Sequence, residues 1–465
     1  MNKTIFIIIT RGFLIRNILR SGVLKHLKQP GYKIVILFQT LKGKEIPEYL
    51  KDEFGGDFVV FEKISSFPSN NFFDRIYRVF VKWTSLLVYS DSTWSYIRAG
   101  NVTNRKRMFF WKYLERFVFS ILTKVHFLKY IVRSIEKNVF VSNLYAPYFD
   151  KYKPDLVFST SIIGGIDISF MKEASERGIK TVAMTKGWDH ASRVLYRFIP
   201  DKIVIQNFVM KEYLIKHQKI DASKIEVCGF PQFDWYNKKE LLLGREEFIK
   251  SLGLDPDRKL IFFGSAGSNS PKDCDIIDML AKFINTPGML MKPACMIVRP
   301  HFSDSGVAKY DKYQVMDNIA VDKSMVYSDI IPMGWDYGLK ETKFFVNLLH
   351  HSDIVVNIAS TLTLDACFFD RPIISVAFGV YHNLRNGQDV TNIHYETDHY
   401  QDVTKTGGVD VVMNEKELLE SVNNYLVHPE YKSAERKILL DKLCYKTDGN
   451  SSERIASVIL SELKN

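Results

Sequence analysis

The chain has 465 residues, of which 46% are hydrophobic and 25% are charged, and its formal net charge is +10. This length predicts two domains that each bury a core, while 25 glycines and 15 prolines are too few for a collagen-like or disordered chain. Five scattered cysteines without a C-x-x-C pair argue against a disulfide framework or zinc ribbon and fit a reducing cytoplasm. The apolar run Ile5–Ile9 is too short for a signal peptide, and no window reaches the ~20 apolar residues that span a bilayer.

Short apolar runs alternate with helix-length amphipathic stretches along most of the chain. Most runs have four to six residues, are rich in Val and Ile and are apolar throughout, which is typical of parallel strands covered by helices on both faces. In chain order the runs are Phe6–Ile9, Ile34–Phe38, Phe58–Phe61, Leu156–Ser159, Thr181–Met184, Ile203–Ile205, Ile225–Cys228, Leu260–Phe263, Met296–Val298, Ile319–Val321, Ile354–Ile358, Ile373–Val376 and Val409–Val412. The pattern predicts an α/β fold with two Rossmann-like, doubly wound domains that face a cleft.

The boundary between the two predicted domains falls where a strand ends at Gly229 and Pro231. A polar helical stretch follows, and a new strand begins near Leu260. We therefore expect a first domain over residues 1–235, a second over 236–445, and a C-terminal helix within 446–465.

Residues 71–140 interrupt the strand–helix alternation and carry most of the net charge. This segment contains thirteen Lys and Arg against four Asp and Glu, together with 17 aromatic residues. We interpret it as a helical, aromatic-basic insertion in the first domain. Three interpretations stay open: a helix hairpin that is largely buried, a surface for an anionic membrane or acceptor, and a single-stranded nucleic-acid site.

Several polar residues of the second half directly follow predicted strands, where ligands bind in open α/β sheets. Ser360 and Thr361 stand where a strand becomes a helix, a position at which hydroxyls and backbone amides hold phosphates, although plain helix capping gives the same pattern. Arg299 and His301 follow another strand and can contact phosphates or a leaving group. The small-residue loop after Phe263 allows a nucleotide to approach the backbone closely through Gly264, Ser265 and Ser268.

In the first half, Asp189 and His190 follow the strand Thr181–Met184 as adjacent titratable groups. Either one is a suitable general base for deprotonating a hydroxyl, and the sequence leaves the choice between them open. Arg11 and Gly12 follow the first strand, and Arg193 lies just after the Asp-His pair, so we expect these residues in the acceptor part of the same cleft. The sequence contains no zinc-type spacing, and we expect no metal.

Four motifs together resemble glycosyltransferases of the GT-B architecture. The stretch Gly229-Phe230-Pro231-Gln232-Phe233-Asp234 is similar to the interdomain crossover of that group, and Arg299-Pro300-His301 resembles the His-Pro motif of bacterial sialyl-, polysialyl- and Kdo-transferases and of teichoic-acid glycerophosphotransferases. Residues 354–374 resemble the Ser/Thr motif that holds the donor phosphate, and Gly187-Trp188-Asp189-His190 stands where glycerophosphotransferases carry a Trp-His-Gly turn.

The resemblance implies a metal-independent transferase of surface-polysaccharide synthesis that uses a nucleotide-sugar co-substrate. It implies that the second domain binds the donor, that the first holds a glycan or lipid-linked acceptor, and that residues 71–140 face the inner side of the cytoplasmic membrane. Two other enzyme functions stay open, a polyol-phosphate transferase such as a glycerophosphotransferase and a non-hydrolysing nucleotide-sugar 2-epimerase. Nucleic-acid binding is the least favoured function because no RNA-binding signature is present.

Overall fold

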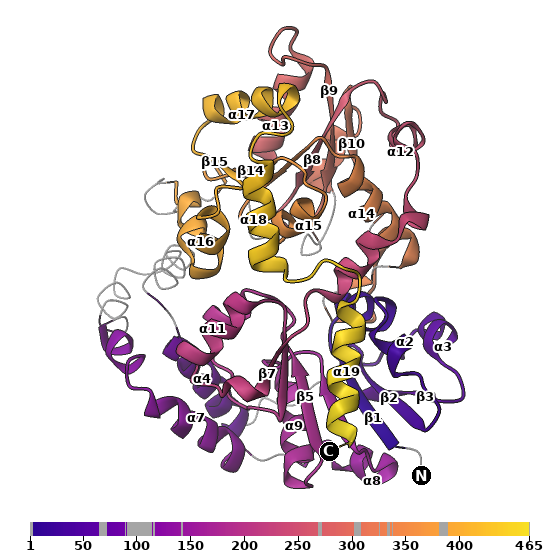
Figure 1. The fold of residues 1–465 in the computed structure, drawn as a ribbon, viewed down its shortest axis with the longest axis vertical. Helices are drawn as coiled ribbons and strands as arrows, with labels where there is room; N and C mark the ends of the chain where they lie inside the picture. Colours follow the sequence, from indigo (N-terminus) through magenta and orange to yellow (C-terminus); the bar gives the residue numbers. More distant parts are fainter. Residues whose placement is uncertain are drawn as a thin grey trace.

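The computed structural model describes residues 3–64, 72–88, 90, 114, 117–140, 143–267, 272–301, 308–324, 326–332, 335–336, 338–380 and 389–464. These residues form two α/β units that stand one above the other in Figure 1. Each unit is built on a parallel sheet with helices on both faces, which confirms the fold class that the apolar runs predict.

The first sheet has seven parallel strands in the order β3-β2-β1-β4-β5-β6-β7. Its strands are β1 (Lys3–Ile9), β2 (Tyr32–Gln39), β3 (Val59–Ile64), β4 (Leu156–Ser159), β5 (Lys180–Met184), β6 (Lys202–Ile205) and β7 (Ile225–Val227). The order changes direction between β1 and β4, so the sheet is doubly wound and has its switch point there. The helices of this unit are α1 (Gly12–Leu14), η1 (Ile15–Arg20, a π-helix), α2 (Val23–Leu27), α3 (Glu48–Phe54), α8 (Ala146–Tyr152), α9 (Gly165–Glu176), α10 (His190–Arg193) and α11 (Phe208–Lys216).

The second sheet has six parallel strands in the order β10-β9-β8-β13-β14-β15. They are β8 (Lys259–Gly264), β9 (Ala294–Arg299), β10 (Ile319–Val321), β13 (Ile354–Asn357), β14 (Ile373–Val376) and β15 (Asp410–Val412), and a short antiparallel pair, β11 (Val326–Tyr327) and β12 (Trp335–Asp336), stands apart. The helices are α12 (Arg245–Ser251), α13 (Asp273–Asn285), α14 (Leu339–His351), α15 (Leu362–Phe368), α16 (Asp398–Thr404), α17 (Glu415–Val427) and α18 (Ser433–Cys444). The boundary predicted near residue 235 lies between β7 and β8.

The C-terminal helix α19 (Ser451–Lys464) returns to the first unit after α18 has packed on the second (Figure 1). Its residues Ile455, Ile459 and Leu463 belong to the same buried cluster as the strand residues of β1 and β2. The Asp234 carboxylate in the first crossover accepts hydrogen bonds from the backbone N–H groups of Ser451 and Ser452, at 3.0 and 2.7 Å. This capping ties the two interdomain crossovers together at the start of α19.

The insertion is described in part, as α4 (Phe72–Ser85), the 3-10 turn η2 (Leu86–Val88), a helical stretch over 117–122 and α7 (Phe127–Asn138). Its inner side is held by a buried ion cluster, in which Glu136 of α7 meets Lys172 of α9 at 2.9 Å and Arg197 at 3.1 Å. Its outer side leaves large apolar side chains exposed, with Phe72 at 71%. A largely buried helix hairpin therefore describes the inner side of the insertion and not its exposed outer side. No helix among the described residues is long and apolar enough to cross a membrane.

Candidate functional site

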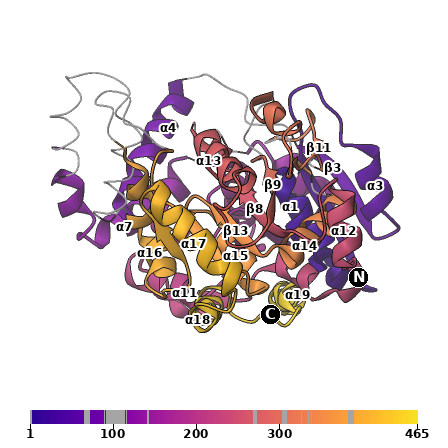
Figure 2. The ribbon, with the colours of Figure 1, turned by 90° about the horizontal axis from the view of Figure 1, so that it is seen from above.

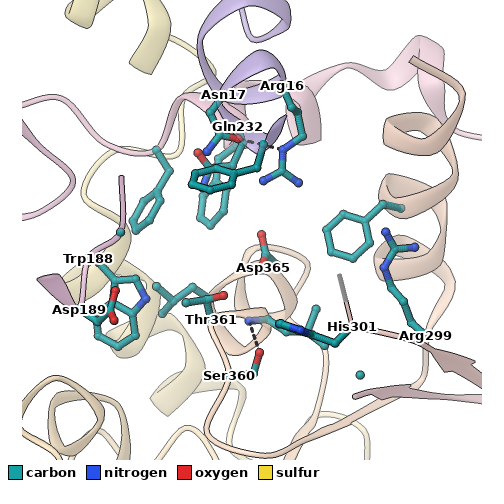
Figure 3. Close-up of a pocket in the computed structure, with 18 of the residues that line it drawn as sticks. Arg16, Asn17, Trp188, Asp189, Gln232, Arg299, His301, Ser360, Thr361 and Asp365 are labelled. Atoms are coloured by element: carbon teal, nitrogen blue, oxygen red, sulfur yellow. Dashed lines mark hydrogen bonds between the residues drawn. The ribbon is translucent and has the colours of Figure 1, made fainter. Parts of the chain in front are cut away.

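A cavity of about 450 Å³ lies between the two units, at the carboxyl ends of their strands (Figure 3). Arg16 and Asn17 enter it from the π-helix after β1, and Lys186 to His190 enter it from the loop after β5. The opposite wall comes from the loops after β8, β9 and β13 and from the first turns of α15. Figure 3 shows Trp188 and Asp189 on one side, Arg299 and His301 on the other, and Asp365 between them.

Eight of the twelve site residues predicted from the sequence line this cavity, namely Asp189, His190, Gly264, Ser265, Arg299, His301, Ser360 and Thr361. Arg193 is not a lining residue, but its guanidinium donates a 2.8 Å hydrogen bond to the Asp189 carboxylate. Arg11 and Gly12 are not lining residues either, and Gly12 is buried. Ser268 lies outside the described residues.

The Asp189-His190 turn combines a negative group with a neutral imidazole. Burial opposes ionisation of Asp189, but electrostatic interactions with His190, His399 and Arg193 and the hydrogen bond from Arg193 outweigh it and hold the pKa of that carboxyl below its usual value. Burial lowers the pKa of His190 to about 4, so its ring is neutral at pH 7. The His190 Nδ1 atom is buried without a hydrogen-bond partner among the described residues, and Nε2 lies 3.9 Å from Asp189 Oδ1. A neutral imidazole of this kind can accept a proton from a substrate.

Gly187 lies directly against this turn. A Cβ atom added at Gly187 would lie 2.7 Å from Asp189 Oδ1 and 3.4 Å from the His190 ring, so glycine leaves room for both side chains. The Trp188 ring meets His399 of α16 edge to face, with ring centroids 5.3 Å apart. The loop that carries the Asp-His pair is thereby in contact with the second unit.

Arg299 is fixed by contacts on two sides. Its guanidinium donates to the buried Asp322 carboxylate, and it lies over the Phe345 ring at 4.7 Å from the centroid. His301 follows two residues later, and Figure 3 shows its ring and the Ser360 side chain turned toward one another. The end of β9 and the turn after β13 thus present a cation, an imidazole and a hydroxyl at one place.

The turn that carries Ser360 and Thr361 has a constrained backbone. Ala359 has φ of 41°, in the left-handed region, and its N–H donates to the Tyr395 hydroxyl at 3.1 Å. The Ser360 hydroxyl accepts from the Leu362 N–H at 3.2 Å, and Thr361 makes no capping hydrogen bond with its side chain. Ser360 therefore does cap the helix, and both Ser360 and Thr361 also line the cavity.

Gly264 and Ser265 have different surroundings within the same loop. A Cβ atom at Gly264 would come within 2.3 Å of Leu362 Cδ2, so this position allows the two loops to approach closely. The Ser265 hydroxyl donates to the buried Asp273 carboxylate and accepts from the Tyr310 hydroxyl at 2.7 Å. Ser265 is therefore held by the second unit's own polar network.

Three charged lining residues were not among the predicted site residues: Arg16, Lys186 and Asp365. Arg16 lies on the π-helix, where its Nε donates to Asn17 Oδ1 at 2.9 Å. Burial raises the pKa of Asp365 to about 6, while a 2.5 Å hydrogen bond from the Tyr236 hydroxyl and the charges of Arg16 and Arg299 oppose that rise. Burial and the charge of Arg11 lower the pKa of Lys186. For Arg16 and Lys186 the available sequence signal was their position soon after the end of a predicted strand.

No group of three or more His, Cys, Asp or Glu side chains with metal-binding geometry occurs among the residues that the structure describes.

The sequence matches the family model of CDP-glycerol:poly(glycerophosphate) glycerophosphotransferases over residues 176–461. No curated protein sequence matches the chain. Among solved structures, the chain resembles Staphylococcus aureus MnaA with UDP (TM-score 0.55, 11% identity, 99% of this chain and 97% of that one) and the Neisseria meningitidis UDP-GlcNAc 2-epimerase with UDP-GlcNAc (0.54, 12%, 98% and 100%). It also resembles the wall teichoic acid polymerase TagF with CDPG (0.52, 12%, 100% and 89%).

The two parallel sheets and these structural likenesses show the GT-B fold, which confirms the architecture that the motifs resemble. The family model matches more than half of the chain and spans the Asp-His turn as well as the whole second unit. The chain belongs to the CDP-glycerol:poly(glycerophosphate) glycerophosphotransferase family.

Proposed function

We propose that the chain transfers a polyol phosphate, of the glycerophosphate type, from a cytidine-diphosphate-linked donor to a hydroxyl of a glycan or polymer acceptor. The observation that carries this proposal is a cavity in which a neutral imidazole beside a carboxylate faces a wall with a guanidinium, a second imidazole and two hydroxyls. The family match favours phosphoryl transfer over the nucleotide-sugar chemistry that the motifs first suggested.

In this proposal the wall from the second unit binds the donor diphosphate. Arg299 and His301 contact its oxygens, and Ser360 and Thr361 donate from the turn after β13. Arg299 suits this task because Asp322 and Phe345 fix its guanidinium, so little ordering is needed when the anion binds. Gly264 lets Leu362 of α15 pack against the end of β8, which brings the parts of this wall together.

The first unit supplies the base. The acceptor hydroxyl oxygen forms a bond to the phosphorus that carries the polyol, and the bond from that phosphorus to the bridging oxygen breaks, so that CMP leaves. The hydroxyl proton passes to His190, which is neutral at pH 7, while Asp189 stays ionised beside Arg193 and stabilises the imidazolium that forms. Sugar transfer from the same kind of donor would instead break the bond between the sugar and the diphosphate and release CDP.

Charge on the leaving nucleotide is offset by side chains in this mechanism. Arg16 and Lys186 line the cavity from the first unit, opposite Arg299. Fixed positive groups in a cavity sheltered from water stabilise developing negative charge strongly. We therefore propose that turnover does not need a divalent metal ion.

We also propose a cytoplasmic enzyme that contacts the anionic inner face of the membrane through the insertion. The outer face of α4 exposes an apolar stripe of Phe72, Ile76, Val79 and Trp83. Three cations, Arg75, Arg78 and Lys82, lie beside this stripe on the same helix. Apolar side chains flanked by basic ones favour binding at the surface of anionic lipid. Trp83→Glu should weaken co-sedimentation with phosphatidylglycerol vesicles, and an unchanged bound fraction would contradict the contact.

The test of the proposed reaction measures which nucleotide is released from CDP-glycerol in the presence of EDTA and an acceptor. We expect CMP, whereas no turnover with CDP-glycerol would overturn the polyol-phosphate assignment, and loss of turnover on EDTA addition would overturn metal independence. Ser360→Ala and His190→Ala should each lower kcat/KM about 10²–10³-fold. The matched controls are Ser461→Ala and His428→Ala, at exposed positions outside the cavity, which should leave kcat/KM unchanged.

A further inference from the structure

A second cavity, of about 660 Å³, lies at the junction of the insertion, α11 and α16. Both views of the ribbon show α7, α11 and α16 on the same side of the molecule (Figures 1 and 2). The side chains that the argument uses are Lys124, Lys129, Lys216, Lys405, Tyr213 and Asp398. The cavity thus combines residues from three parts of the chain, and none of them belongs to the catalytic cavity described above.

The lining of this cavity is predominantly basic. Within the described ranges, Lys124, Lys216 and Lys405 form no ion pair with a carboxylate. Burial, together with the charges of Lys219 and Arg133, lowers the pKa of Lys129. Of the two carboxylates in the lining, Asp402 already accepts a 2.8 Å hydrogen bond from Lys442.

Asp398 provides the second observation. Its Oδ2 atom is buried and has no hydrogen-bond partner among the described residues. A buried carboxylate oxygen without a donor is costly, so a ligand hydroxyl that donates to Asp398 would remove that cost. The cavity therefore offers cations for anionic groups and one acceptor for a hydroxyl.

The basic cavity is linked to the catalytic cavity by shared lining residues. Tyr213, Asp398 and Asp402 also line a small cavity of about 30 Å³, and Trp188 lines both that small cavity and the catalytic one. The Tyr213 hydroxyl donates to the Val88 carbonyl at 3.1 Å, which fixes the insertion against α11 at this point. The small cavity is too small for a glycerol-phosphate unit, so a chain-like ligand that reaches both larger cavities would pass outside it.

We propose that the basic cavity binds phosphodiester groups of the acceptor, so that the lysines hold successive phosphates and Asp398 accepts from a hydroxyl of the polyol. This inference rests on the proposed function, because it assumes an acceptor that is itself a polyol-phosphate chain. Such a chain carries both anionic groups and hydroxyls, and the lining offers lysines for the first and Asp398 for the second. Neither an uncharged glycan nor an isolated lipid headgroup presents both groups in repeated order.

The experiment measures binding of a synthetic six-unit glycerol-phosphate oligomer to the full chain by calorimetry. The test variant is the double substitution Lys216→Gln with Lys405→Gln, and its matched control is Lys340→Gln with Lys437→Gln, which removes two charges from exposed positions outside the lining. We expect the dissociation constant of the test variant to rise at least tenfold and its salt dependence to become shallower by about two released ions, with no change in the control. Asp398→Asn should weaken the oligomer further without altering the salt dependence.

Three outcomes would overturn this inference. The first is equal oligomer binding by the test and control variants. The second is a test variant that loses binding to phosphatidylglycerol vesicles but still binds the oligomer, which would mean that the lysines bind lipid. The third is an equal loss for inorganic phosphate and oligomer, which would indicate a simple anion site. CMP binding, read as a melting-temperature shift, reports on the catalytic cavity separately, so failure of the donor assignment and failure of this inference remain distinguishable.

Discussion

Replacing Glu136 with Gln should markedly destabilise the described part of the insertion. Glu136 has no exposed surface, and it meets Lys172 at 2.9 Å and Arg197 at 3.1 Å, whose side chains are 5% and 3% exposed. Glutamine keeps the size of the side chain but leaves two buried cations without their counter-charge. Breaking a buried ion pair by removing one partner costs about 3–5 kcal/mol.

Thermal unfolding followed by circular dichroism, with limited proteolysis of the insertion, measures this effect. For a cooperative unit of this size, 3–5 kcal/mol corresponds to a fall in Tm of roughly 10 °C. The triple variant Glu136→Leu, Lys172→Met and Arg197→Met removes all three charges together, so it should be far closer to the original protein. A Glu136→Gln variant within about 1 kcal/mol of the original protein would refute the reasoning, because the two cations would then have water or other partners.

Three further predictions concern pH and capping. Burial lowers the pKa of both His190 and His399 to about 4, so between pH 4 and 6.5 the unfolded chain binds more protons than the folded one and the free energy of unfolding rises with pH. From pH 7 to pH 5 the free energy of unfolding should fall by about 2 kcal/mol for each ring. In urea titrations, His399→Phe should make this fall smaller. Burial raises the pKa of Asp365 to about 6, so this carboxyl becomes negative as pH rises through 6. The diphosphate of CDP-glycerol does not titrate in this range, and the affinity for CDP-glycerol should therefore fall several-fold. Calorimetry with Asp365→Asn should show no such fall. Asp234→Ala removes the cap of α19 and should cost about 1–2 kcal/mol in chemical denaturation, whereas an unchanged midpoint would contradict the capping role.

The strands were predictable because buried parallel strands are apolar throughout. The runs Ile34–Phe38 and Ile354–Ile358 coincide with β2 and β13, since both faces of each strand are covered by helices. The pair β11 and β12 was not predicted, because two-residue strands carry no periodic signal. End positions such as Phe58, which precedes β3, depend on tertiary hydrogen bonds and not on composition.

The candidate site was predictable where a polar residue directly follows a strand. Arg299, Ser360 and Asp189 were found by that rule, and the cavity brings them together. Arg16, one turn after the first strand, also follows this rule, although the sequence does not predict the π-helix that carries it. Asp365 was missed because its position three residues inside a helix looks like an ordinary dipole-favoured carboxylate, and its burial depends on the opposite unit.

The position of α19 has a consequence for how the protein is made. Ile455 and Ile459 complete the core around β1 and β2, so these strands receive a core partner that is translated long after them. During translation the matching surface of the first unit stays open to water or to chaperones until some 450 residues have been added. Deleting α19 would therefore expose the core of the first unit and leave the core of the second unit covered. The stability of the first sheet thus depends on a helix that follows the whole second unit in the chain.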